Sequence, residues 1–190
     1  MQYLRWPMLL SLSLGFGGCA SAPDPILYTL SMPAPQLDDT RAEGMIGLSE
    51  LSLPAYARNQ QITTAVNDFQ IKEDDNHRWA VPPSEALTSA LAQMLEQETG
   101  QSVLKRPYPN GIRPELRVSV TFDRMLRGIN GQAELSGQYI VSSRTSSPLV
   151  GSFSVYVPAS DGSYDAYMAA MASGVEKLSR LIAADITTLE

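Results

Sequence analysis

The sequence predicts an α+β domain, in which a mixed, largely antiparallel sheet has two long helices packed on one face. Two observations lead to this prediction. Three consecutive segments between residues 116 and 157 alternate apolar and polar residues, a pattern typical of half-buried antiparallel strands. Two further segments, 82–100 and 163–189, repeat apolar residues every three or four positions, as amphipathic helices do. Packing both helices on the apolar sheet face is the simplest way to bury these side chains.

The N-terminal part of the domain is expected to be extended. Four short strand candidates lie between turn residues and prolines: Ile26–Leu30, Met45–Leu53, Gln61–Val66 and Asp68–Glu73. The last two would form a hairpin with its turn at Asn67 and Asp68. Between the first two, residues 31–44 contain two prolines and three acids, and we expect a loop there.

A helix is predicted to begin at Pro82-Pro83 and to end at Gly100. Proline suits the first helical turn, Glu85 complements the helix dipole there, and glycine favours the left-handed C-terminal cap. The apolar stripe of this helix comprises Leu87, Leu91, Met94 and Leu95. Residues 102–105 follow as a short strand.

Three long strands are then expected over Leu116–Leu126, Gln132–Ser142 and Val150–Val157. Their predicted buried faces comprise Leu116, Val118, Val120 and Phe122, then Ala133, Leu135, Gly137, Tyr139 and Val141, then Phe153, Val155 and Val157. Residues 128–131 provide the turn between the first two strands. The opposite face would meet either solvent or a second subunit.

The last segment, Ser163–Leu189, is the strongest helix prediction. Its stripe comprises Tyr164, Tyr167, Met168, Met171, Val175, Leu178, Leu181, Ile182, Ile186 and Leu189. We expect this stripe to cover the sheet. Gly174 alone interrupts the helix, at a cost of about 1 kcal/mol relative to alanine.

Residues 1–18 have the features of a secretion signal that ends at Cys19. Arg5 precedes a short apolar run, and Gly17-Gly18 precede Cys19, the single cysteine of the chain. The run is shorter than the roughly 20 residues that a membrane span needs. We therefore predict a lipoprotein signal, in which Cys19 is lipidated, with palmitate among its acyl chains, and becomes the mature N-terminus.

The main alternative is a plain secretory signal cut after Ala20-Ser21-Ala22, although Pro23 would then follow the cut. With lipidation, residues 19–25 form a tether and residues 26–190 form a single domain. Several acyl chains anchor a protein stably in a membrane, since each buried CH₂ contributes about 0.8 kcal/mol. Alanine rather than aspartate after Cys19 predicts sorting to the outer membrane, on its periplasmic face.

The composition narrows the classes of ligand. The 190 residues carry a formal net charge of −6, which argues against nucleic acid or an anionic membrane surface as the primary ligand.

The only histidine, His77, lies in Asp74-Asp75-Asn76-His77. A zinc site needs three or four ligands, so we expect a solvated turn there instead of a metal site. Nucleotide-binding and hydrolase motifs are missing from the sequence, which indicates a non-catalytic protein without a cofactor.

Two groups of residues are candidates for contact with a partner. Tyr56, Arg58 and Trp79 lie outside the helical stripes, and aromatic and arginine side chains often anchor interfaces. Core packing is the alternative for Trp79. A second group of arginines forms either solvent-facing charge paired with acids or an interface rim: Arg106, Arg113, Arg117, Arg124 and Arg127. We expect solvent-facing charge for Arg117 and Arg124.

Several phrases of the sequence resemble the PqiC-type lipoproteins, a family of auxiliary lipoproteins of ABC-type transporters. The phrases are I-L-Y-T-L at 26–30, I-G-L at 46–48, L-P-A-Y-A-R-N-Q-Q-I at 53–62, H-R-W-A at 77–80 and S-Y-D-A-Y at 163–167, followed by the closing helix. Their order and spacing extend the resemblance over essentially the whole mature chain.

The resemblance implies an outer-membrane lipoprotein that faces the periplasm and does no chemistry itself. Its partner would be a membrane-anchored MCE-domain protein that spans the periplasm, and the system would move lipids, with phospholipid a candidate cargo, and protect envelope integrity. The resemblance also implies a homo-oligomer, with a ring as the candidate form. Two alternatives stay open, namely an assembly or regulatory lipoprotein of a cell-wall or outer-membrane machine, and a hydrolase built around His77.

Overall fold

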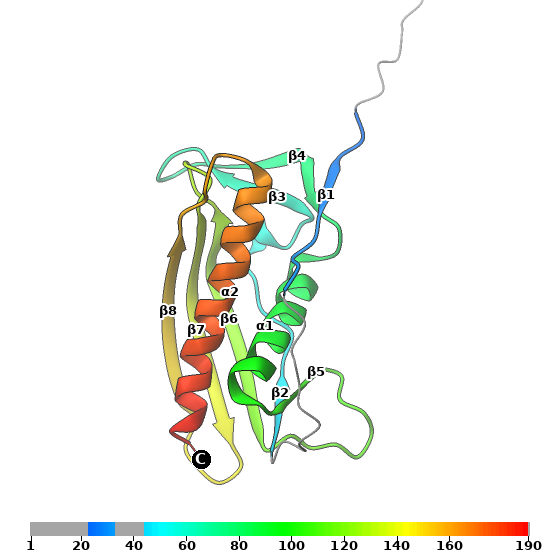
Figure 1. Ribbon diagram of the computed structural model, residues 1–190, viewed down its shortest axis with the longest axis vertical. Helices are drawn as coiled ribbons and strands as arrows, with labels where there is room; N and C mark the ends of the chain where they lie inside the picture. Colours follow the sequence, from blue (N-terminus) through cyan, green and yellow to red (C-terminus); the bar gives the residue numbers. More distant parts are fainter. Residues whose placement is uncertain (1–22, 33–43, 190) are drawn as a thin grey trace, which may run out of the picture.

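A computed structural model describes residues 23–32 and 44–189 of the chain. Figure 1 shows the arrangement of its strands and helices. In chain order, the elements are β1 (Ile26–Tyr28), β2 (Met45–Leu48), the 3₁₀ turn η1 (Ala55–Ala57), β3 (Gln61–Ala65), β4 (Ile71–Trp79), α1 (Pro83–Thr99), β5 (Ser102–Lys105), β6 (Leu116–Arg127), β7 (Ala133–Ser143), β8 (Leu149–Val157) and α2 (Tyr164–Thr187).

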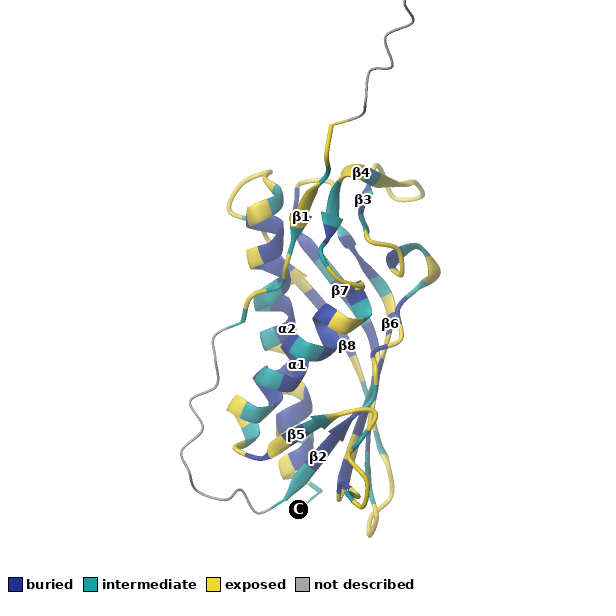
Figure 2. Ribbon diagram, turned by 90° about the vertical axis from the view of Figure 1, so that its right-hand side faces the viewer, coloured by how far each residue is buried: buried dark blue, intermediate teal, exposed yellow. Residues whose placement is uncertain are grey.

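The fold has two layers, with both helices on one face of an eight-stranded mixed sheet (Figures 1 and 2). The predicted α+β class is confirmed, because the longest strand pairs are antiparallel and both helices lie on the same face. The core fills the space between the layers, and its largest fully buried side chains include Leu87 and Leu91 of α1, Leu135 of β7, and Met171 and Leu178 of α2. Neither helix in the described part of the chain is long and apolar enough to cross a membrane.

Strand β6 is the branch point of the sheet. One edge of β6 pairs along its length with β7, which pairs in turn with β8, and both pairs are antiparallel. The other edge of β6 pairs in parallel with β2 near its start and with β3 near its end, at Thr64 and Arg127. Strand β2 then leads to β5, whereas β3 leads through β4 to β1. The branch carrying β1 is therefore also the branch that connects to the N-terminal tether.

The alternating burial of β6, β7 and β8 follows the prediction closely. The expected inward-facing apolar side chains are buried in all three strands. Gly137 of β7 lies against the β6 bulge between Phe122 and Arg124, where a Cβ would come within 2.0 Å of the Thr121 carbonyl oxygen. Gly174 allows α2 a similarly close approach, because a Cβ there would lie 2.7 Å from Leu135 Cδ1.

Helix α1 ends as the sequence predicts, since Gly100 caps it with a φ of 68°. Helix α2 ends at Thr187, two residues before the predicted Leu189, and at its start the Ser163 hydroxyl accepts a hydrogen bond of 3.1 Å from the Ala166 N–H. One member of the predicted α2 stripe is placed differently. Leu181 is 45% exposed, because it faces an open groove beside Tyr156 at the outer edge of β8.

Two predicted strand boundaries are wrong. Strand β2 ends at Leu48, and the chain beyond it contacts β6 through a single bridge between Ser52 and Thr121. Strand β4 begins at Ile71 and runs to Trp79, so the hairpin turn is longer than Asn67-Asp68. Most of the predicted loop, residues 33–43, lies outside the described residues, as does the predicted signal with Cys19.

Candidate functional site

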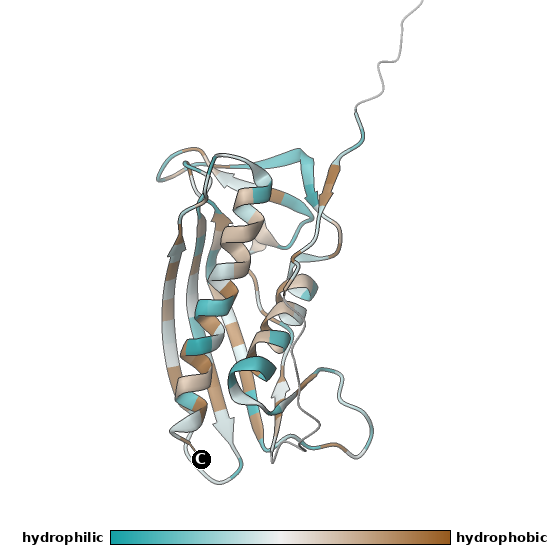
Figure 3. Ribbon diagram, viewed as in Figure 1, coloured by the Kyte–Doolittle hydropathy of each residue, from teal (hydrophilic) through white to brown (hydrophobic). Residues whose placement is uncertain are grey.

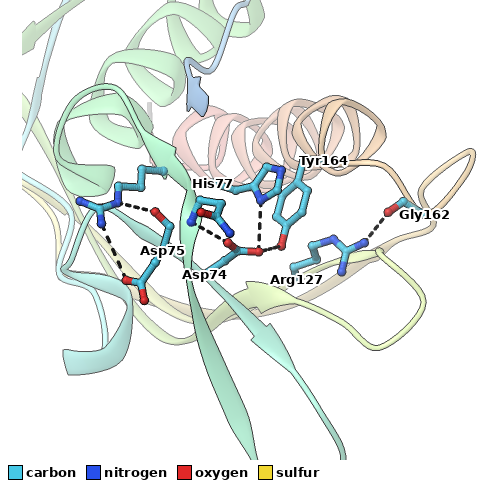
Figure 4. Close-up of polar contacts among 8 residues, drawn as sticks. Asp74, Asp75, His77, Arg127, Gly162 and Tyr164 are labelled. Atoms are coloured by element: carbon cyan, nitrogen blue, oxygen red, sulfur yellow. Dashed lines mark hydrogen bonds and ion pairs between the residues drawn. The ribbon is translucent and has the colours of Figure 1, made fainter. Parts of the chain in front are cut away.

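Five polar and aromatic side chains meet at the end of the domain where the N-terminal segment enters. They are Tyr28 of β1, Asp74 and His77 of β4, Arg127 of β6 and Tyr164 of α2, and we call them the tether-end cluster. Figure 4 shows the four members from β4, β6 and α2. Members of this cluster lie up to 136 positions apart in sequence. The cluster joins β1 to both layers of the fold, since β4 and β6 belong to the sheet and α2 belongs to the helical layer.

The backbone brings these residues together through strand pairing and a helix cap. Strand β1 pairs in parallel with the end of β4, with Ile26 opposite His77 and Tyr28 opposite Trp79. The Ala80 N–H donates a 2.8 Å hydrogen bond to the Tyr28 carbonyl and so extends this short pairing. Tyr164 is the first residue of α2, directly after its capping residue Ser163. Its ring is therefore fixed at the tether end of the helix.

Asp74 is the polar centre of the tether-end cluster. Its Oδ2 accepts a 2.5 Å hydrogen bond from the Tyr164 hydroxyl, and the same oxygen lies 3.1 Å from His77 Nδ1. Its Oδ1 accepts a 2.8 Å hydrogen bond from the Asn76 N–H. Both oxygens of the carboxylate are thus engaged, and they connect β4 to the first residue of α2.

The rings in the tether-end cluster pack around Tyr164. The His77 ring stacks on it with centroids 3.8 Å apart and an angle of 6° between planes, and the Tyr28 ring lies 5.9 Å from each. The Arg127 Cζ lies 4.8 Å from the centre of the Tyr164 ring, a cation–π distance, and its Nη2 donates to the Gly162 carbonyl. Arg127 therefore connects the end of β6 to the loop before α2.

This environment shifts the pKa values of three groups. Partial burial acts to raise the pKa of Asp74, but hydrogen bonds from Tyr164, the Asn76 N–H and His77 outweigh it, so the pKa lies below its usual value. Desolvation raises the pKa of Tyr164, and its bond to Asp74 adds to this. Desolvation also raises the pKa of Tyr28. The cluster is consequently held as a carboxylate with neutral phenols at neutral pH.

The contacts of the tether-end cluster favour a mechanical role. The carboxylate is occupied by groups of the chain itself, and the Tyr164 hydroxyl donates to it, so neither is aimed at an external reactant. In the part of the chain that the structure describes, acidic, His and Cys side chains do not gather in a group that could hold a metal ion. The cluster instead connects β1 to β4 and α2.

The three residues predicted from sequence as a partner interface lie near one another along the backbone, since the Trp79 N–H donates to the Gln60 carbonyl. Arg58 is exposed, and its Nε donates a 3.0 Å hydrogen bond to the Leu53 carbonyl. Tyr56 is half-buried, and its hydroxyl accepts a 3.3 Å hydrogen bond from the Met125 N–H. Trp79 is 2% exposed and belongs to the core, the alternative left open for it.

The tether-end cluster was not predicted from the sequence. The prediction of a solvated turn at Asp74–His77 is wrong, because both residues lie in β4. The strand could not be recognised from the run Asp74-Asp75-Asn76-His77, because its polar side chains do not alternate with apolar ones. They are instead partly exposed or bound to distant partners. Arg124 pairs with an acid as expected, with its Nε 2.7 Å from Glu134 Oε2, whereas Arg127, for which both interpretations were open, contacts a ring and a carbonyl. A one-dimensional pattern carries no signal for such contacts.

Comparison with known proteins identifies a matching family and similar structures. A family model described as "ABC-type transport auxiliary lipoprotein component" matches residues 28–183. A crystal structure of an uncharacterised protein superposes with a TM-score of 0.73 at 18% identity, covering 86% of this chain and 99% of that one. A DUF330 protein from Xanthomonas campestris superposes with a TM-score of 0.68 at 12% identity, covering 83% and 92%. The search of curated proteins gave no match. At these identities, the structures show a shared fold.

Proposed function

The chain belongs to the family of ABC-type transport auxiliary lipoprotein components, and we propose that it is the non-catalytic auxiliary subunit of an MCE-type system that moves lipids between membranes. The family match over residues 28–183 carries this proposal, because it spans nearly the whole described domain. In the proposal, the domain is a docking subunit that a lipid anchor holds at the outer membrane, facing the periplasm. Its partner is a periplasm-spanning MCE-domain protein, and phospholipid is the candidate cargo.

The geometry of the N-terminal end supports an anchored domain. We propose that Cys19 is lipidated, and four residues of extended chain between Cys19 and Pro23 span about 14 Å at most. The domain would then be held close to the membrane surface by its β1 end. A short strand gives little resistance to movement by itself, and the tether-end cluster supplies the missing connection to β4 and α2. The anchor would thereby hold this end of the domain next to the membrane.

Two exposed features are available for protein contacts. The 3₁₀ turn η1 presents Arg58 at the surface with Tyr56 beside it, and we propose this as the face for the MCE-domain partner. Strand β8 pairs only with β7 among the described strands, and its nine residues contain neither charge nor proline. Unprotected edges of this kind readily accept another strand. A second copy of the chain on the β8 edge would give the proposed homo-oligomer.

Native mass spectrometry of the protein extracted from envelopes in mild detergent tests this proposal. We expect a triacylated mass at Cys19, in a higher oligomer that carries an MCE-domain protein. Arg58→Glu should release the MCE-domain protein, whereas Arg117→Glu, a matched exposed arginine on the outer sheet face, should retain it. A lipidated monomer that carries a cell-wall or barrel-assembly protein instead would overturn the transport assignment.

A further inference from the structure

Three apolar side chains at the tip of the β3–β4 hairpin are exposed to solvent. Phe69 is 96% exposed, and Val66 and Ile71 on either side of the turn are 53% and 44% exposed. An isolated surface leucine or valine needs no explanation, but a fully exposed phenylalanine flanked by two further apolar residues does. The tip is therefore a candidate contact surface.

Hydrogen bonds within the turn fix its shape. The Val66 N–H donates to the Gln70 carbonyl at 2.8 Å, which closes the hairpin. Asn67 Oδ1 accepts from the Phe69 N–H at 2.9 Å, and the Asn67 amide donates to Gln70 Oε1 at 3.0 Å. The polar groups of the turn thus bond to one another, and none of these bonds draws the Phe69 ring back onto the domain. The ring is presented at the tip of a structured loop.

This tip lies at the tether end of the molecule. Strand β3 runs parallel to β6 with Thr64 opposite Arg127, so the hairpin turn comes beside the β6–β7 turn, where Ile129 is 56% exposed. Figures 1 and 2 show the hairpin and the N-terminal end of β1 at the same end of the domain. In β1 itself, Ile26 and Leu27 are 55% and 60% exposed, and Figure 3 shows this strand as hydrophobic.

We propose that the β3–β4 turn inserts Phe69 into the membrane that holds the lipid anchor. The occupant is a bilayer because the tether brings a membrane surface to this end, within about 14 Å of Pro23. Attraction by charge does not explain the contact, since the chain has a net charge of −6 and Asp68 is the only charged residue from Val66 to Ile71. Interfacial burial of apolar side chains next to a lipid anchor adds a second contact with the membrane; since several acyl chains already anchor stably, this contact acts on the orientation of the domain.

With two attachment points, the domain would have a defined orientation on the membrane. The acyl chains alone would leave it free to swivel about the tether, whereas an inserted turn fixes a second position across the same end. This inference rests on the proposed lipidation of Cys19. Attachment to vesicles must therefore be measured separately from insertion of the turn.

The test uses Phe69→Trp in the lipidated full-length protein, reconstituted into phosphatidylethanolamine–phosphatidylcholine vesicles that contain brominated lipids. Once residues 1–18 are removed, Trp79 is the one native tryptophan, and at 2% exposure it serves as an internal reference. We expect blue-shifted emission from the introduced indole and strong quenching by bromines close to the glycerol backbone, because interfacial side chains lie about 5–10 Å into the headgroup–acyl boundary. High salt should leave the quenching unchanged.

Ser146→Trp is the matched control, because Ser146 is exposed in the β7–β8 turn, which lies beside the start of β6 and so at the end of the sheet away from Arg127 and β1. Its indole should stay accessible to aqueous iodide and escape the bromines. The proposal is overturned if the indole at position 69 remains open to iodide in vesicle-bound protein, or if it is shielded from both quenchers, which would indicate a protein partner on the turn. Loss of vesicle attachment itself, measured by co-sedimentation, would contradict the lipidation of Cys19 and not the geometry of the turn.

Discussion

Two regions of this domain are held together by different physics. The helix-backed block, formed by β6, β7, β8 and α2, is stabilised by buried apolar area between a regular antiparallel sheet and a long helix. The tether end, formed by β1 and β4 with the tether-end cluster, is held by a short parallel strand pair and by specific polar and aromatic contacts. The block determines whether the chain folds, and the tether end determines how the folded domain is attached to its N-terminal segment.

These two kinds of interaction also explain why one region is buried and the other lies near the surface. Apolar packing has no preferred direction and its strength grows with the area removed from water, so it suits an interior. A hydrogen-bonded carboxylate between Tyr164 and His77 fixes position at little apolar area, which suits a site close to the surface. We therefore expect the loss of these groups to leave most of the fold intact.

The largest expected effect comes from the helix-backed block. Leu135→Ala removes a side chain that is 1% exposed and packs under α2 at Gly174. We expect a loss of about 2–5 kcal/mol in the free energy of unfolding, because the cavity cannot close completely. Urea unfolding followed by circular dichroism measures it. The matched change at the tether end, Leu27→Ala, should cost less than about 0.5 kcal/mol. Equal losses at the two positions would contradict the comparison.

A smaller and more local effect is expected from Tyr164→Phe. This change removes the hydroxyl that donates to Asp74 but keeps the ring that stacks on His77. We expect a loss of about 1 kcal/mol in unfolding free energy. Hydrogen exchange should quicken at the Ala80 amide, which bonds β1, while β7 amides stay unchanged. Tyr156→Phe, at a 56% exposed ring of β8, should do neither. An unchanged Ala80 amide would show that the hydroxyl does not hold β1.

The block could be predicted from sequence because its information is local. Alternation in β6 to β8 and the apolar spacing in α2 correctly indicated which side chains are buried, with Leu181 as an exception beside the open edge of β8. The cap at Gly100 also follows from a single residue type. Each of these features depends on neighbours within a few positions, which periodicity reports directly.

The tether end could not be predicted because its information is distant. Tyr164 meets Asp74 across 90 positions, and the Asp-Asp-Asn-His run reads as a turn until these partners are known. Tyr56, Arg58 and Trp79 were selected by residue type alone, and residue type does not distinguish a core ring such as Trp79 from an exposed anchor such as Arg58. Their role as a partner face stays a prediction, as does lipidation of Cys19.

The smallest expected effect is an acid sensitivity confined to the tether end. The pKa of Asp74 is lowered in the folded protein from its ordinary value of 3.8, so its carboxylate stabilises the fold above that value. That contribution is lost as pH falls through the lowered pKa, when protonation weakens the contact with His77 and the hydrogen bond from Tyr164. We expect Asp74→Asn to flatten the fall in the urea midpoint below about pH 4, where a free aspartate would begin to protonate.

Tyr139 in the helix-backed block provides a control for this fall in the urea midpoint at low pH. Desolvation, together with its hydrogen bond to Asp185, raises the pKa of Tyr139 to about 12, so its hydroxyl stays neutral throughout the acid range. Tyr139→Phe should therefore change the pH dependence of the midpoint above the ordinary tyrosine pKa of about 10, and should leave the fall that depends on Asp74 in place. If Asp74→Asn leaves the fall in the urea midpoint below about pH 4 unchanged, another carboxylate causes this fall. The tether-end cluster would then not be the acid-sensitive part of the domain.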